Sequence, residues 1–184
     1  MKIKIILIVL LMSALTQLQA QKYITKNALI HFYSETPAEK IEANNNQVNC
    51  ALDIKTGDFI FKVLMQSFQF ERALMQEHFN ENYVESHLFP NSTFIGKVDG
   101  IESIDFSKNG THNVTVTGVL TMHGVSKTVT EKGTIEIIDG KIKAKSVFNI
   151  LIADYNIKVP SAVMGKIADT MEVRVDATLE KLAK

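Results

Sequence analysis

The side chains best suited to chemistry are concentrated in ten positions: His78, Asn80, Glu81, Tyr83, Glu85 and His87. Two histidines with a carboxylate are a set that binds zinc in many proteins. The spacing of His78 and His87 matches no zinc signature, however, and the local pattern places the two on different helices. Hydrogen bonding and helix capping are the competing interpretation. We predict no metal ligand here, and a metal or enzyme site based on these histidines is kept only as a third hypothesis.

The rest of the chain offers no nucleophile with an activating partner. No serine lies between glycines at a strand-to-helix elbow, and no glycine pattern for a dinucleotide or a phosphate loop is present. Cys50 is the single cysteine, and its position on the apolar face of a predicted strand indicates a buried, unreactive thiol. We therefore predict that the protein is not an enzyme, has no catalytic residue and needs no cofactor.

The first twenty residues have the pattern of a targeting segment. Lys2 and Lys4 precede an apolar run, and Ala20 supplies a small residue before the expected cleavage point. The run is shorter than the roughly 20 apolar residues that span a bilayer. We expect a signal peptide at 1–20, a periplasmic or secreted protein, and no stable membrane anchor after cleavage. The remaining 18 basic and 20 acidic residues give a formal charge of −2, which argues against nucleic acid as a partner.

The mature chain is dominated by a two-residue alternation of apolar and polar side chains, which is typical of strands buried on one face. Tight-turn signals such as Asp139-Gly140 join neighbouring strands as antiparallel hairpins. Closure of about eight such strands removes exposed edges. The sequence therefore predicts an all-β fold, a single antiparallel barrel with strands near 27–33, 47–54, 58–66, 92–99, 112–122, 125–138, 141–153 and 170–182.

Two segments depart from the strand pattern. Apolar residues in 68–89 recur at helical intervals, so we expect a helical insertion lying against the barrel. Asn82, with Glu85 three residues later, is predicted to cap a second short helix within it. The segment 154–169 is predicted to be irregular, because a proline and a glycine interrupt it.

A barrel of about eight strands either fills its interior with side chains or leaves room for one small ligand. The inward candidates are mostly aromatic or branched aliphatic, so an enclosed ligand should be apolar: Phe59, Phe61, Val63, Phe94, Val98, Val116, Leu120, Phe148, Ile150 and Val175. Polar residues expected at the rim, where they would meet a head group or pair in solvent, are His31, Tyr33, Arg72, His78 and Tyr155. Periodicity does not distinguish a lined cavity from a filled core.

Several stretches resemble the YceI-like family in their order and spacing, from about Ile30 to Leu179. They are Phe68–Glu71 with Met75–Glu81, Tyr83–Pro90 before Thr93-Phe94, Val116–Lys127, and Phe148–Ile150 leading into Asp154–Ile157. The resemblance implies that residues 21–184 form a lipocalin-like barrel, exported to the periplasm. It implies a carrier that binds an isoprenoid or another amphiphilic lipid in its interior, and not an enzyme.

The strand around Ile150–Tyr155 departs from the family pattern. Many members have an aromatic-acid-arginine run near the barrel mouth, whereas this stretch contains no arginine that would meet a pyrophosphate. A quinone, a fatty acid or an amide-type lipid therefore stays open beside an isoprenoid. The alternative to a lipid-binding barrel is a filled barrel that acts as a structural or stress-related interaction module. A homodimer is compatible with either hypothesis.

Overall fold

The computed structural model describes residues 22–163 and 165–182, so the expected signal peptide at 1–20 lies outside the described residues. Within the described ranges, no helix is long and apolar enough to cross a membrane. The elements follow in this order: β1 (Lys22–Glu35), β2 (Lys40–Asp53), β3 (Asp58–Leu64), the 3-10 turn η2 (Met65–Ser67), β4 (Gln69–Phe70), α2 (Ala73–His78), the π-helical turn η3 (Phe79–Tyr83), β5 (Asn91–Val98), η4 (Ile101–Ser103), β6 (Gly110–Met122), β7 (Val125–Ile138), β8 (Lys141–Leu151), η5 (Ile152–Tyr155), η6 (Ser161–Val163) and β9 (Thr170–Lys181).

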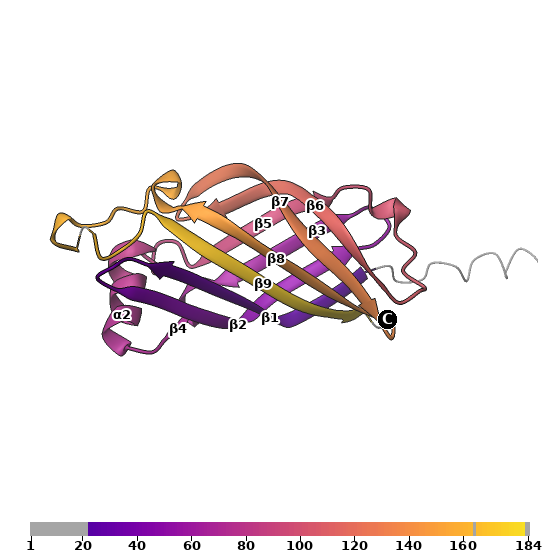
Figure 1. Ribbon diagram of the computed structural model, residues 1–184, viewed down its shortest axis with the longest axis horizontal. Coiled ribbons are helices and arrows are strands. Elements are labelled where there is room, and N and C mark those ends of the chain that lie inside the picture. Colours follow the sequence, from indigo (N-terminus) through magenta and orange to yellow (C-terminus); the bar gives the residue numbers. More distant parts are fainter. Residues whose placement is uncertain (1–21, 164, 183–184) are drawn as a thin grey trace, which may run out of the picture.

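Eight of these strands close into one antiparallel barrel. The order around the ring is β1-β9-β8-β7-β6-β5-β3-β2, and pairing of β2 with β1 completes it. Among the described residues, the one strand outside this ring, β4, is two residues long and pairs with the first half of β2. Figure 1 shows an elongated barrel with α2 at one end and the β7–β8 hairpin at the other. The predicted all-β barrel is confirmed.

The predicted hairpin turns form where the backbone needs a left-handed conformation. His123 and Gly124 join β6 to β7 with φ angles of 50° and 74°, and Asp139 and Gly140 join β7 to β8 with φ angles of 50° and 78°. Two consecutive positive φ angles are characteristic of the turn whose twist matches that of paired strands. These turns fix the register in which inward side chains of neighbouring strands meet.

The end of the barrel away from α2 is filled with side chains. Ile137, Ile142 and Leu179 are each at most 2% exposed, and Ile142 and Leu179 are opposite one another in register. Cys50 belongs to the same core, and burial raises the pKa of its thiol. The predicted inert cysteine is therefore buried as expected.

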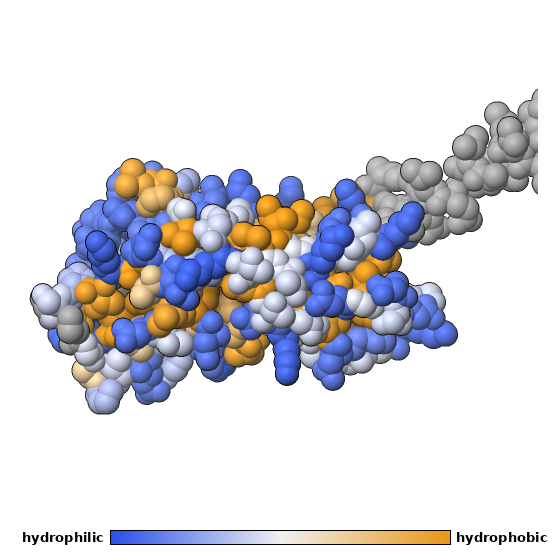
Figure 2. All heavy atoms as spheres, turned by 90° about the horizontal axis from the view of Figure 1, so that it is seen from above, coloured by the Kyte–Doolittle hydropathy of each residue, from blue (hydrophilic) through white to orange (hydrophobic). Residues whose placement is uncertain are grey.

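The outer wall is less polar than strict alternation suggests. Ile60, Ile95 and Val119 are adjacent in register across β3, β5 and β6, and each is more than 40% exposed. Figure 2 shows apolar side chains interspersed with hydrophilic ones over one face of the molecule. The alternation thus predicts which face a residue occupies better than it predicts the polarity of the outward residues.

The predicted helical insertion at 68–89 is only partly correct. α2 has six residues and continues into the π-helical turn η3, whereas the segment begins as the short strand β4. The predicted second helix is wrong, because Asn82 lies inside η3 and caps nothing. Glu85 adopts a φ of 43°, and its carboxylate binds the ring of His123 at 2.8 Å instead of returning to the backbone of Asn82. His87 therefore lies in a turn and not on a helix.

Candidate functional site

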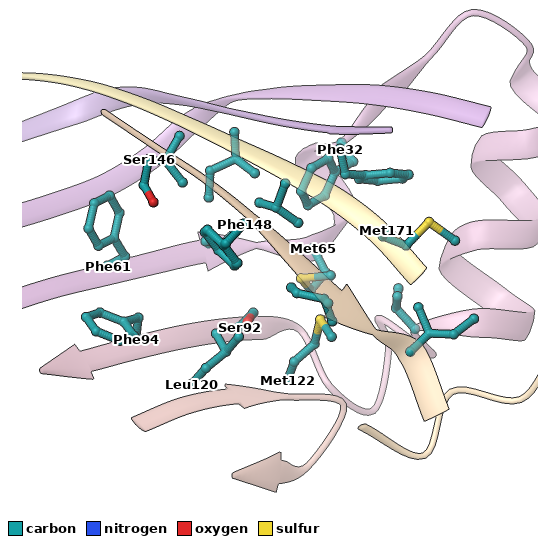
Figure 3. A pocket seen from close by; sticks show the side chains of 18 of the residues that line it. Phe32, Phe61, Met65, Ser92, Phe94, Leu120, Met122, Ser146, Phe148 and Met171 are labelled. Carbon is teal, nitrogen blue, oxygen red and sulfur yellow. The ribbon is translucent and has the colours of Figure 1, made fainter. Parts of the chain in front are cut away.

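A cavity of about 470 Å³ occupies the half of the barrel toward α2. Nine of the ten predicted inward side chains line it: Phe59, Phe61, Val63, Phe94, Val116, Leu120, Phe148, Ile150 and Val175. Val98 is the exception, since it is 3% exposed and belongs to the packed core. Figure 3 shows Phe61, Phe94, Leu120 and Phe148 pointing into a shared space. The barrel is therefore filled at one end and hollow at the other.

Two glycines and one aromatic ring shape the inner part of the cavity. Gly96 and Gly118 are opposite one another on β5 and β6. A Cβ atom on Gly96 would lie 2.5 Å from the ring of Phe94, and one on Gly118 would lie 2.7 Å from it. The ring of Phe94 therefore rests on bare backbone, which is possible only because neither position has a side chain.

The opposite end of the cavity contains an aromatic cluster beneath α2. Phe32, Phe68, Phe70 and Phe79 contact one another with ring centroids 5.1–5.7 Å apart. Above them, α2 has no buried residue, and Leu74 is 60% exposed although it lines the cavity. The apolar side of α2 is thus incompletely covered by protein.

Charged groups at the end of the cavity beneath α2, which we call its mouth, are largely paired. Arg72 forms an ion pair with Glu39, and both line the cavity. Burial and the nearby Glu39 carboxylate raise the pKa of the Tyr83 phenol, which also faces the cavity. His78 and Lys166 complete the polar part of this end. Sequence reasoning could not identify Glu39 as a site residue, because its partner Arg72 lies 33 positions away.

Three of the five predicted rim residues lie elsewhere. Phe32 faces the cavity, so its neighbours His31 and Tyr33 point outward. His31 lies 3.5 Å from the carboxylate of Glu42, and the hydroxyl of Tyr33 donates to a glutamate two residues away. Tyr155 is 3% exposed and does not line the cavity. Of the predicted rim residues, only Arg72 and His78 reach the cavity.

A histidine that the sequence marked only as a turn residue links three segments near the mouth. His123 Nδ1 is 2.9 Å from the carbonyl oxygen of Tyr155, and its Nε2 is 2.8 Å from the carboxylate of Glu85. The ring also contacts Phe89 at 4.6 Å between centroids. His123 therefore holds the insertion, the β6–β7 turn and η5 together.

The two histidines first considered for metal binding have different surroundings. His78 lines the apolar cavity inside the barrel, whereas His87 lines a separate, more open hollow with Asn80 and Glu81. In the part of the chain that the structure describes, no group of three or more His, Cys, Asp or Glu side chains is arranged to hold a metal ion.

The fold is shared with several solved structures. A polyisoprenoid-binding domain from Saccharophagus degradans, implicated in plant cell wall breakdown, is similar with a TM-score of 0.78 and 14% identity, over 89% of this chain and 100% of that one. BcnA of Burkholderia cenocepacia is similar with a TM-score of 0.67 and 16% identity, over 83% of this chain and 95% of that one. The YceI protein of Campylobacter jejuni is similar with a TM-score of 0.58 and 18% identity, over 76% of this chain and 85% of that one.

At these identities the likeness establishes the fold alone. No curated protein matched the chain in a sequence comparison. The family model described as the YceI-like domain matches residues 23–179. That match covers most of the chain and every strand of the barrel except the first residue of β1 and the last two of β9, so the chain belongs to the YceI-like family.

Proposed function

We propose that the protein is an exported carrier that holds a single-chain amphiphilic lipid inside the barrel. The observation that carries this proposal is the continuous cavity of about 470 Å³ with an almost entirely apolar lining. Ligand pockets typically measure roughly 300–1,000 Å³ and combine apolar walls with a few polar groups. The cavity has both features, because apolar side chains from all eight barrel strands surround it and a few polar groups lie among them.

An isoprenoid, a quinone or a fatty-acid-like chain suits this cavity. The aromatic and branched side chains of the lining match a branched or unsaturated chain better than a polar ligand. The solved relative from Saccharophagus degradans is described as a polyisoprenoid-binding domain, which supports a ligand of this class. Arg72, the arginine of the lining, is already neutralised by Glu39. A pyrophosphate head group is therefore not favoured.

Binding is favoured over catalysis by the state of the hydroxyl groups in the lining. Ser92 Oγ donates to the carbonyl oxygen of Thr121 at 2.8 Å, and Ser146 Oγ donates to that of Lys132 at 2.7 Å. An activated serine would instead donate to a basic side chain. We infer that these serines close the backbone of the wall and do not act as nucleophiles.

Export is proposed from the charged start and the short apolar run of residues 1–20. N-terminal sequencing of protein recovered from the periplasm or the medium should begin at Gln21. Recovery of exported protein that still begins at Met1 would contradict the proposal.

Solvent extraction of the purified mature protein, followed by mass spectrometry, tests lipid binding directly. The wild type should release a lipid in stoichiometric amount. Phe148→Glu should release none, because a buried charge in the apolar wall is costly. Val147→Glu is the matched control: Val147 is the adjacent residue on β8, is 59% exposed and faces outward, so its lipid should be unchanged. A wild-type protein without lipid would favour the interaction-module hypothesis.

A further inference from the structure

The inner part of the cavity contains a carboxylate, that of Glu131 on β7. It shares a strand face with Ile135, which is 1% exposed, so its side chain points inward. Gly133, the next inward position, is paired with Ser146. Figure 3 places Ser146 at the end of the cavity away from α2. Glu131 lies roughly 7 Å along its strand from Gly133, in the part of the cavity away from α2, and Ile135 and Ala144 line the cavity one inward step deeper.

The barrel wall divides at the same place. β7 and β8 pair from their hairpin as far as Gly133 and Ser146. Both strands continue beyond this pair, but β7 is then paired only with β6 and β8 only with β9. Ser146 Oγ donates to the carbonyl oxygen of Lys132 where the strands separate. Glu131 is the first inward residue on β7 beyond the last pair.

The Glu131 carboxylate has no partner in the protein. Among the residues that the structure describes, no hydrogen bond or ion pair reaches it, and burial raises its pKa. The charges of Asp154 and Glu131 add to burial in raising the pKa of the Tyr155 phenol. Lys145, the basic residue of the adjacent strand β8 that lines the cavity, is paired with Asp176 at 3.0 Å. A partly buried acid that faces an apolar cavity without a partner in the protein is a suitable contact for a polar group of the ligand.

The two ends of the cavity thus differ in which groups lack a partner. At the mouth, Arg72 and Glu39 satisfy one another, the aromatic cluster offers an apolar surface, and Leu74 is 60% exposed. At the inner end, Glu131 lacks a polar partner. Resting on the proposed lipid-binding function, we infer that the lipid lies with its head group at Glu131 and its tail toward α2.

The chemistry of Glu131 defines the class of head group. A protonated carboxyl both donates and accepts a hydrogen bond, and an ionised one accepts two or more. Either form is complementary to an uncharged hydroxyl or amide. A carboxylate or phosphate placed against it would be repelled or would have to take up a proton. The cavity therefore selects lipids with a neutral head group over anionic lipids of the same chain length.

Three probes with one cis-unsaturated C18 chain separate these effects: oleyl alcohol, oleate and the hydrocarbon 9-octadecene. Each is titrated into delipidated mature protein that holds the neutral fluorophore N-phenyl-1-naphthylamine, and displacement gives its affinity. At pH 8 the wild type should bind oleyl alcohol about fivefold or more tightly than 9-octadecene, which is the effect of one hydrogen bond. Oleate should bind more weakly than the alcohol.

Two variants and a control locate the contact. Glu131→Leu should lose the preference for the alcohol over the hydrocarbon, and Glu131→Gln should keep it while binding oleate about fivefold or more tightly than the wild type does. Glu136→Gln changes an outward glutamate of the same strand and should reproduce the wild type. If Glu131→Leu instead binds all three probes more tightly by the same factor, the inner end holds the tail and the inference is wrong. A wild type that binds none of the probes would contradict the proposed function itself.

Discussion

Replacing Gly118 by alanine tests how the inner part of the cavity is built. A Cβ atom at this position would lie 2.4 Å from the Cα of Gly96, 2.6 Å from the carbonyl oxygen of Ile95 and 2.7 Å from the ring of Phe94. The ring can rotate away, but the first two contacts are with the backbone of β5. Relief therefore requires β5 and β6 to move apart in the middle of their paired stretch.

Overpacking of this kind costs about 1–3 kcal/mol. Alanine offsets part of that cost, because it removes about 0.5–1 kcal/mol of the conformational entropy that glycine loses on folding. We expect a net loss of about 1–2 kcal/mol in the free energy of unfolding, which for a domain of this size lowers the Tm by roughly 2–8 °C. The displaced ring of Phe94 should also occupy part of the cavity and weaken lipid binding.

Gly110→Ala is the matched control on the same strand. The nearest atom to its Cβ would be His112 Nε2 at 3.5 Å, which is an ordinary contact. This variant should be as stable as the wild type or slightly more stable. Urea denaturation monitored by circular dichroism compares the three proteins. Equal midpoints for Gly118→Ala and Gly110→Ala would refute the close approach of β5 and β6 at this point.

Three further changes probe the mouth and the interior. Burial raises the pKa of Glu131 above its ordinary value of 4.5, so between these two pKa values the native state keeps a proton that the unfolded chain releases. The wild type should therefore lose stability relative to Glu131→Gln as the pH rises through this window. Parallel pH profiles of the free energy of unfolding for the two proteins would contradict this. His123→Asn keeps a residue type that tolerates the left-handed turn but removes the ring's contacts with the Tyr155 carbonyl and the Glu85 carboxylate. A neutral ring donates to one of these two acceptors at a time, so the variant should cost about 1–3 kcal/mol in urea denaturation. Met75→Pro should lower the free energy of unfolding by about 1 kcal/mol, because it removes the hydrogen bond from the Met75 amide to the Arg72 carbonyl oxygen. A proline in a helix interior would cost roughly 3 kcal/mol, and the Tm distinguishes the two values.

The strand faces were predictable because a period of two leaves little ambiguity where apolar residues alternate without interruption. On β8, for example, Phe148 and Ile150 follow this pattern and line the cavity. Val98 followed the same pattern but joined the packed core, since alternation identifies the inward face and not the depth along the barrel. Placing a residue in the hollow or the filled half requires the register between strands.

The polar part of the site was less accessible to sequence reasoning. On β7 the inward positions include a lysine, Glu131 and Gly133, which obscures the apolar period that would have marked the carboxylate as internal. The bond between His123 and Glu85 joins positions 38 apart, and no local rule connects them. The helical period around α2 was real, but it persisted for only six residues before η3 changed the direction of the chain.

The cavity reaches into the paired stretch of β7 and β8 as far as Ile135 and Ala144, and it continues past the point where these strands stop pairing. Closer to the hairpin, the paired inward residues Ile137 and Ile142 are at most 2% exposed and fill the interior. Beyond the last pair, inward residues such as Glu131 and Phe148 are only partly buried and line the cavity. Separation of two neighbouring strands widens the ring, and side chains of ordinary size no longer meet across it. The same separation that creates room for a lipid thus places an unpaired carboxylate beside it.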